Sequence, residues 1–387
     1  MPDKSLFVST SILIAISVVL VYSLSAYTVL LFGYSEFHFL IRQMIFGILS
    51  IVVMWTLAQL DPDVWLSRIG FTLFIGGFIL IAAMPFLPAF LVSEVGGAKR
   101  WIKVFGFSLA PVEFFKIGFI YFLAWSFSRK LGYHANMGVL KEFVRILPYG
   151  TVFAIVMVLV AVMQKDLGQV AVLGMTLLLL LILAGSSFKL FFSLIGSAFF
   201  VLFLLIVTQE HRIARVKSWW ASTQDMVLTL FPESIASHLR VESFQEPYQI
   251  GHSLNAIHNG GIIGTGMSNG TFKLGFLSEV HTDFILAGLA EEFGFIGIVV
   301  VTVLFLWILL RIFKVANRTK NQTTYLFSVG VGLLITFAFL INAYGISGLI
   351  PIKGISVPFL SYGGSSMLAA AVGVGMVLMA SRKVKYS

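Results

Sequence analysis

The stretch DFILAGLAEEFGFIGIVVVTVLFLWILL, residues 283–310, decides the fold of this chain. It is long enough to cross a membrane, because a spanning helix needs roughly 20 mainly apolar residues. It also begins with an acid, Asp283. A carboxylate at the edge of hydrocarbon is costly and is usually kept for function. The stretch therefore predicts a spanning helix with a candidate functional residue at the membrane surface.

The composition of the whole chain agrees with a membrane protein. Of its 387 residues, 58% are hydrophobic and 11% are charged, and the mean hydropathy is +0.98, whereas soluble domains carry about 25% charged residues. The absence of cysteine excludes disulfides and thiolate metal sites. Basic residues in short loops, which set topology and meet anionic lipid, account for the net charge of +9, so we expect no nucleic-acid binding.

Apolar segments of spanning length recur along the chain. They predict an all-α polytopic membrane protein with about ten transmembrane helices, in one domain over residues 1–387. The ten segments are residues 9–33, 40–60, 70–92, 107–128, 147–164, 167–185, 187–208, 284–312, 324–347 and 359–381. Only Lys165 and Asp166 separate the fifth from the sixth, which predicts a tight hairpin or a broken pair of helices.

The distribution of Lys and Arg predicts the orientation. Fourteen of them fall on the side that holds both termini, against seven on the other side once the five in residues 209–283 are set aside. Basic residues in short loops favour the cytoplasm, and long loops do not count. We expect cytoplasmic termini and a large extracytoplasmic loop, residues 209–283, between the seventh and eighth helices. Trp219 and Trp220, with basic residues just before them, predict an interfacial helix in this loop.

Asp283 has three interpretations. It could be a general base whose pKa is raised by partial burial. It could instead cap the following helix, because Asp is a common N-cap residue. It could also share a metal with Glu279 and His281, whose spacing suits a loop or strand but not one face of a helix.

Two further charged clusters lie in or against apolar segments. Glu113 and Lys116 are three residues apart and share a helix face. They could pair with each other, with Arg42 or with Asp166. The cluster is either a buried structural ion pair or part of a polar cavity for an anionic headgroup. Lys99 and Arg100, beside Trp101, are either snorkelling interfacial residues or a clamp for a diphosphate.

Two motifs rich in small residues complete the candidates. The glycine-rich stretch 260–275 lacks the dinucleotide and P-loop fingerprints, so we expect a loop that approaches a substrate closely instead of a nucleotide site. Residues 358–366 open the last span. Their small and hydroxyl side chains, which include Ser361, Ser365 and Ser366, favour either close helix packing or a phosphate contact.

Taken in order, these motifs resemble the SEDS family of cell-wall polymerases (shape, elongation, division and sporulation proteins). The resemblance covers essentially the whole chain. Pro351–Gly354 and the loop that contains Asn269 are closer to the division member of the family than to its elongation member. The chain departs from the family at Val112, Lys165 and Ser278, each beside an acid that is kept. The matching blocks are residues 97–102, 111–116, 164–168, 248–253, 260–274, 281–285, 291–294 and 358–366.

The resemblance implies an activity and partners. Members of the family span the membrane ten times and join lipid-linked disaccharide-peptide units (lipid II) into glycan strands. They work with a transpeptidase, a class B penicillin-binding protein. A division member implies other divisome proteins as partners and a place at the septum, in the bacterial inner membrane.

The resemblance also implies roles for residues. Asp283 becomes the general base of an inverting glycosyl transfer, in which the 4-hydroxyl of the acceptor attacks C1 of the lipid-linked sugar and pyrophosphate leaves. Whether a divalent cation, Mg²⁺ or Mn²⁺, binds together with the pyrophosphate stays open, and no protein metal site is predicted. A lipid II flippase, an ion-coupled transporter and a non-catalytic scaffold for the transpeptidase stay as alternatives. The expected substrate-binding residues are Arg42, Lys99, Arg100, Glu113, Lys116, Asp166, Arg212, Lys273, Ser361, Ser365 and Ser366.

Overall fold

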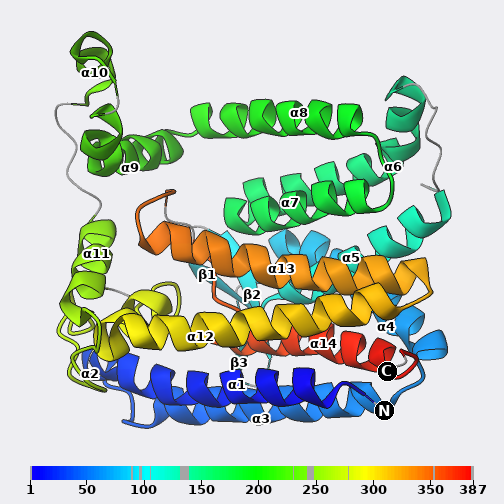
Figure 1. The fold of residues 1–387 in the computed structure, drawn as a ribbon. Helices are drawn as coiled ribbons and strands as arrows, with labels where there is room; N and C mark the ends of the chain where they lie inside the picture. The colour runs from blue at the N-terminus through cyan, green and yellow to red at the C-terminus, as the bar shows by residue number, and fades with distance from the viewer. Residues whose placement is uncertain are drawn as a thin grey trace.

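Long helices, nearly parallel to one another, form most of the computed structural model (Figure 1). The structure describes residues 2–88, 90–95, 98–104, 106–130, 139–229, 231–241, 248–277, 279–351 and 354–384. Within these ranges, eight helical segments are long and apolar enough to cross a membrane. They are α1 (Lys4–Leu24), α3 (His38–Gln59), α4 (Pro62–Ala83, extended by the turn Met84–Phe86), α6 (Val139–Met157, continued by the π-helical turn Val158–Met163), α8 (Phe188–Val207), α12 (Ile285–Arg318), α13 (Gln322–Ile346) and α14 (Gly364–Ser381). The prediction of an all-α polytopic membrane protein is confirmed.

Two more helices occupy the places of expected spans. They are α5 (Pro111–Lys130), which carries four charged residues, and α7 (Leu167–Leu183), which is 17 residues long. Every expected span thus has a helix, although the number that cross the membrane stays a prediction. A seven-residue helix, α2 (Ala26–Phe32), follows α1 directly.

The boundaries follow local capping signals. Asp61 caps α4 through the amide of Asp63, and Pro62 occupies the first turn, so this helix starts eight residues before the predicted 70 and ends before 92. Asp166 caps α7 by accepting from the Gln169 amide. Lys165 has a φ of 54°, and the chain turns there between the π-helical turn and α7. The expected break at residues 165–166 is therefore a capped turn.

The core of the bundle is formed by α14 packed on α3, α4 on α5, and α12 on α13. Both termini lie at the same end (Figure 1). There the Asp3 amide donates to Ser381 Oγ at 2.9 Å, and Arg311 pairs with the Asp3 carboxylate at 2.6 Å. This arrangement agrees with an even number of spans.

A small antiparallel sheet between α4 and α5 is the element that the sequence analysis missed. Its strands β1 (Val92–Val95), β2 (Ala98–Val104) and β3 (Phe107–Leu109) pair in the order β1-β2-β3. The spans predicted at residues 70–92 and 107–128 leave most of this stretch in the loop between them. The strands are only three to seven residues long, too short for a clear alternation of apolar and polar residues to mark them. The sheet holds Lys99 and Arg100.

In its described residues, the segment 209–283 contains three helices and a glycine-rich turn region. α9 (Glu210–Leu228), α10 (Glu233–Leu239) and α11 (Tyr248–Gly260) lie at the end of the molecule opposite the termini (Figure 1). The indole of Trp219 in α9 donates to the Gly348 carbonyl at 2.7 Å, and α11 packs against α12. Placement outside the membrane and a separate loop region both stay predictions.

The glycine-rich region contacts α12 instead of an open cavity. Gly264 and Gly266 have φ values of +90° and +96°, and a Cβ on Gly264 would lie 2.3 Å from the Glu292 carbonyl oxygen. Gly294, with φ of +65°, interrupts α12 at this level. The freed carbonyls of Glu291 and Glu292 accept from the amides of Thr265 and Gly266. These glycines permit backbone-to-backbone contact, which is a different role from the expected approach to a substrate.

Candidate functional site

Asp283 lies in a turn, residues 279–284, that precedes α12 (hereafter the Asp283 turn). The helix begins at Ile285 with Phe284 in the N-cap position and no capping side-chain bond. Asp283 is therefore not the cap, and that interpretation was wrong. Burial raises the pKa of Asp283 to about 6; the charges of Glu279 and Asp166 raise it as well, and Arg100 opposes them. A carboxylate with this pKa is suited to accept a proton near neutral pH.

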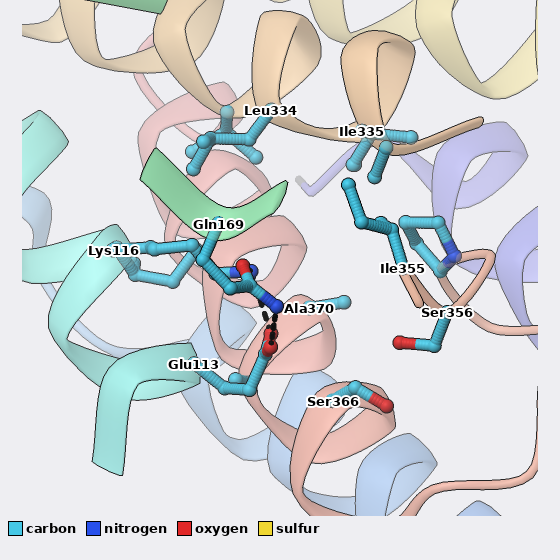
Figure 2. Close-up of a pocket in the computed structure, with 14 residues that line it drawn as sticks. Glu113, Lys116, Gln169, Leu334, Ile335, Ile355, Ser356, Ser366 and Ala370 are labelled. Atoms are coloured by element: carbon cyan, nitrogen blue, oxygen red, sulfur yellow. Dashed lines mark hydrogen bonds and ion pairs between the residues drawn. The ribbon is translucent and has the colours of Figure 1, made fainter. Parts of the chain in front are cut away.

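A small cleft of about 40 Å³ lies between α5, α7, α13 and α14, and Figure 2 shows residues that line it. Its polar lining is Glu113, Lys116, Gln169, Ser356 and Ser366. Its apolar lining includes Leu334, Ile335, Ile355 and Ala370, which Figure 2 labels around the polar group. Polar groups on one side and aliphatic walls on the other suit an amphiphilic ligand.

Glu113 and Lys116 form an ion pair in this cleft, which we name the cleft pair. The Lys116 Nζ–Glu113 Oε2 distance is 2.7 Å. Gln169 of α7 closes the group, since its Oε1 accepts from Lys116 at 2.7 Å and its Nε2 donates to Glu113 at 2.8 Å. Both charged side chains keep 12–13% of their surface exposed, so the pair is at once a structural contact and part of a cavity wall.

Asp166 and Arg100 connect the cleft to the Asp283 turn. Arg100 donates to the carbonyls of Gln164 and Lys165 at 2.7 and 3.0 Å, and it lies 3.9 Å from the Asp166 carboxylate. Burial is the main cause that raises the pKa of Asp166. Arg100 therefore fixes the turn that caps α7, and its charge also acts on Asp283.

Arg42 and Lys99 lie apart from the cleft pair. Arg42 of α3 stacks over the Phe107 ring at 5.9 Å and faces Tyr362. Burial raises the pKa of Tyr362, and Arg42 opposes that rise. The Lys99 ammonium donates to the carbonyls of Pro85 and Leu87 at 3.1 and 2.8 Å. Lys99 thus holds the sheet to the end of α4, which does not favour a diphosphate clamp at that residue.

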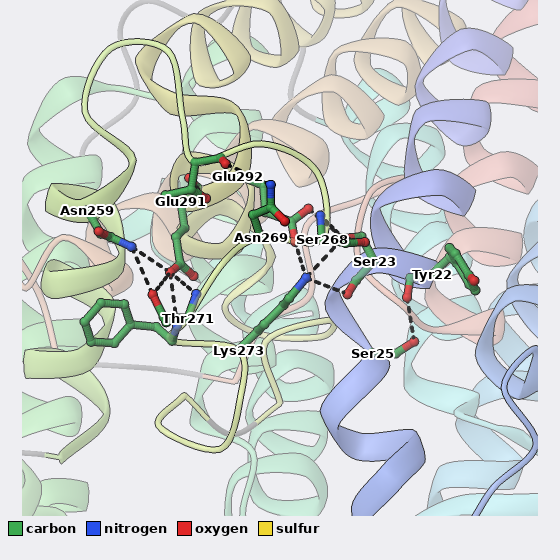
Figure 3. A network of polar contacts seen from close by, with 12 residues as sticks. Tyr22, Ser23, Ser25, Asn259, Ser268, Asn269, Thr271, Lys273, Glu291 and Glu292 are labelled. Atoms are coloured by element: carbon green, nitrogen blue, oxygen red, sulfur yellow. Dashed lines mark hydrogen bonds and ion pairs between the residues drawn. The ribbon is translucent and has the colours of Figure 1, made fainter.

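Lys273 does not fit a substrate-binding role. Its side chain is 2% exposed and pairs with Glu292 at 2.5 Å, and it also donates to the Ser23 carbonyl at 3.2 Å (Figure 3). We name Lys273 and Glu292 the sealed pair. Beside them Glu291 accepts from Asn259 and from the amides of Thr271 and Phe272. The network ties the glycine-rich region to α1 and α12, so the expectation for Lys273 is corrected to a structural one.

Of the three predicted serines, two make structural contacts and one lines the cleft. Ser361 accepts from the Val357 amide at 2.9 Å, and Ser365 bridges the Ser108 carbonyl and the Ala110 amide at 2.9 and 3.0 Å. Both are therefore occupied by the backbone around them. Ser366 lines the cleft. The side chain of Arg212 lies outside the described residues, as do Ser278 and Lys353.

A protein metal site with Glu279, His281 and Asp283 is not favoured. In the described part of the chain, no cluster of three His, Asp or Glu side chains has a metal-binding arrangement. His281 packs edge-on against Phe39 and lies against Tyr362, and burial lowers its pKa to about 4. A cation bound with a substrate pyrophosphate is a separate prediction that these residues do not test.

Sequence reasoning missed Gln169 and Ser356. A glutamine in an apolar run is a signal that could have identified the first, because buried amides need partners. Ser356 follows Ile355 in a short segment between α13 and α14, and no sequence motif marks it.

The geometry defines a class: a polytopic membrane protein with a buried acid beside a partly charged cleft. Comparison with known proteins identifies the family. Residues 3–386 match the sequence model of the FtsW, RodA and SpoVE family, described as "Cell cycle protein". The chain belongs to this family, which confirms the SEDS resemblance.

Individual relatives agree with the family. The chain is 50% identical, over 99% of both sequences, to a protein of Helicobacter pylori named "Probable peptidoglycan glycosyltransferase FtsW". It is 31% identical to a protein of the same name from Bacillus subtilis, covering 100% of this chain and 92% of that one. FtsW is the division member that the sequence analysis favoured.

Solved structures share the fold. The rod shape determining protein RodA of Thermus thermophilus aligns with a TM-score of 0.64 at 21% identity, covering 100% of this chain and 98% of that one. A chain in a structure titled "Structural coordination of polymerization and crosslinking by a peptidoglycan synthase complex" aligns with a TM-score of 0.71 at 21% identity, over 98% of both chains.

Proposed function

We propose that this chain is a peptidoglycan glycosyltransferase that polymerises lipid II into glycan strands, with Asp283 as the general base. Membership of the FtsW, RodA and SpoVE family and the names of its relatives support the activity. The observation that carries the role of Asp283 is its burial beside a second carboxylate and the cleft, which raises its pKa to about 6.

The acceptor hydroxyl loses its proton to the Asp283 carboxylate as it attacks C1 of the donor sugar. The C1–O bond to the lipid pyrophosphate breaks, the configuration at C1 inverts, and the pyrophosphate leaves with the electron pair. Negative charge therefore develops on the leaving group, and a cation held in place beside it stabilises the transition state. In the described part of the chain, Lys116 is the cation that lines the cleft.

The cleft pair is suited to exchange partners when substrate binds. Lys116 is charge-balanced by Glu113 and held by Gln169 in the free protein. A pyrophosphate carries more charge than one carboxylate and can compete for the ammonium. Mg²⁺ or Mn²⁺, bound mainly through phosphate oxygens and water, would add to this stabilisation. Loss of synthesis with EDTA, restored by either cation, is the expected result for the metal.

Partners, site of action and orientation belong to the same proposal. We place the chain in the bacterial inner membrane with cytoplasmic termini, acting at the division septum with a class B penicillin-binding protein and other divisome proteins. The chain lacks native cysteine, so Ser237→Cys in α10 and Lys320→Cys between α12 and α13 report sidedness cleanly. A membrane-impermeant maleimide added to intact spheroplasts should label the first and not the second.

The decisive experiment is glycan-strand synthesis from lipid II by the purified protein with its transpeptidase. Asp283→Asn keeps the size of the side chain and cannot take the proton, so the rate should fall by roughly 10²–10⁴. Lipid II binding and association with the transpeptidase should persist. Glu279→Gln is the matched control in the same turn and should lose less.

Near-normal synthesis by Asp283→Asn would move the base elsewhere. A variant that loses synthesis but still moves lipid II across proteoliposome membranes would favour the flippase. Wild-type protein that binds the transpeptidase but gives no glycan under any condition would favour the scaffold.

A further inference from the structure

Asn342 is a buried amide that the proposed chemistry does not use. It lies on α13, four residues after Ala338, and so on the same face as Val331, Leu334, Ile335 and Ala338, which line the cleft. The residue is 2% exposed. A polar amide at the end of a buried apolar stripe is costly unless it is hydrogen-bonded.

The amide bridges two backbone segments. Asn342 Nδ2 donates to the Asp283 carbonyl oxygen at 2.7 Å and to the Ile355 carbonyl oxygen at 2.8 Å. Both partners are acceptors, so the NH₂ end of the amide must face them and both its hydrogens are used. Asn342 Oδ1 is buried without a hydrogen-bond partner among the described residues.

The two bridged segments are the base and the cleft wall. Ile355 lines the cleft. Its neighbour Gly354 approaches the base so closely that a Cβ there would lie 2.7 Å from Asp283 Oδ2. The Ile355 side chain also packs beside Gly168, close to Asp166. One side chain therefore sets the spacing between the Asp283 turn and the wall against which substrate would lie.

We infer that Asn342 is a positioning residue for Asp283, holding the Asp283 turn and the segment that contains Ile355 in register across the cleft. It does this through the two backbone carbonyls and does not touch the reacting atoms. The inference rests on the proposed function of Asp283 as base. A catalytic group displaced by about 1 Å can lose roughly 10² in rate.

Asn342→Leu tests this directly, because leucine has a similar size and no donor. We expect kcat for glycan synthesis to fall roughly 10- to 100-fold, with KM for lipid II little changed. Asn342→Asp keeps the shape but replaces the donor with an acceptor facing two carbonyls, and it should lose at least as much. The control is Thr336→Val on the same helix, since within the described structure the Thr336 hydroxyl donates to its own helix, at the Gly332 carbonyl. Thermal unfolding of each purified variant checks the folded fraction.

A double variant separates positioning from general destabilisation. In the Asp283→Asn background, Asn342→Leu should cause no further loss of rate, because there is no base left to position. Equal losses in both backgrounds would overturn the inference. So would a normal kcat for Asn342→Leu when Asp283→Asn is inactive, which leaves the proposed function standing. An active Asp283→Asn contradicts the proposed function itself.

The pH profile gives an independent readout. The groups that act on Asp283 from neighbouring elements are Glu279, Asp166 and Arg100, and none of them is altered in Asn342→Leu. A loosened turn admits water to Asp283, so the acidic limb of kcat should move to lower pH in this variant. An acidic limb that does not move would count against a positioning role.

Discussion

Among the described residues, two lysine–glutamate pairs lie inside this bundle, and their surroundings differ. The sealed pair, Lys273 and Glu292, has side chains that are 2% and 0% exposed, and Ser23 completes its hydrogen bonds. The cleft pair, Glu113 and Lys116, has comparable geometry but keeps 13% and 12% exposed on a cavity wall. The comparison teaches that a charge inside a membrane protein marks a ligand site only when space remains beside it.

The largest expected effect is a loss of protein stability when the sealed pair is broken. Lys273→Met leaves Glu292 buried without its cation, which should lower the free energy of unfolding by about 3–5 kcal/mol. The double variant Lys273→Met/Glu292→Met should recover most of that loss. Thermal unfolding of the detergent-solubilised protein measures both. If Lys273→Met is as stable as the wild type, water reaches this pair, and the distinction between the sealed pair and the cleft pair does not hold.

A substitution in the cleft pair should lower the rate of glycan synthesis more than it lowers stability. Lys116→Met removes a cation that lines the cleft, and loss of one such group from a transition state typically lowers the rate by roughly 10²-fold. Because the site is partly open, the unfolding temperature should fall less than for Lys273→Met. Glycan synthesis and thermal unfolding on the same preparations make the test. A Lys116 variant that is unstable but fully active per folded molecule would assign this pair to structure.

The pH dependence comes from Asp283. Its pKa is about 6 in the folded protein against an ordinary value of 3.8. The base must be ionised, so synthesis should fall as pH drops through 6, to about a tenth of its plateau at pH 5. A profile measured with saturating lipid II gives the midpoint. A rate that is flat from pH 7.5 to 5 would exclude a base with this pKa.

The same shift has a consequence for stability. Between pH 3.8 and 6 the folded protein binds a proton that the unfolded chain releases, so stability falls as pH rises through this window. At neutral pH the ionised Asp283 therefore destabilises the fold. Asp283→Asn should unfold at a higher temperature than the wild type at pH 7.5, and the difference should shrink towards pH 4.

The smallest effect concerns the hydroxyl that supports the sealed pair. Ser23 Oγ donates to the Glu292 carboxylate at 2.7 Å. Ser23→Ala should lower the free energy of unfolding by about 1–3 kcal/mol, the range for a lost hydrogen bond to a buried charged group. Synthesis per folded molecule should not change. A selective loss of activity would mean that the sealed pair communicates with the Asp283 turn.

Sequence patterns alone determined the parts of this protein that depend on local composition. Ten apolar runs predicted where the helices lie, because the bilayer requires long apolar helices whatever surrounds them. The position of Asp283 at the start of such a run predicted the candidate base for the same reason. The ordered blocks from residue 97 to 366 predicted the family, which the comparisons confirm.

Only the tertiary structure decided which buried charged side chains border a cavity. Lys273 and Lys116 have the same side chain and each found a glutamate. Whether a cavity remained depended on packing between α5, α7, α13 and α14, segments far apart in the sequence. Packing also determined the partners of two buried amides. Gln169 bonds to residues 53 and 56 positions away. Asn342 bonds to residues 59 and 13 positions away. Residue type sets what a side chain can bond to, and long-range packing determines what comes within reach of it.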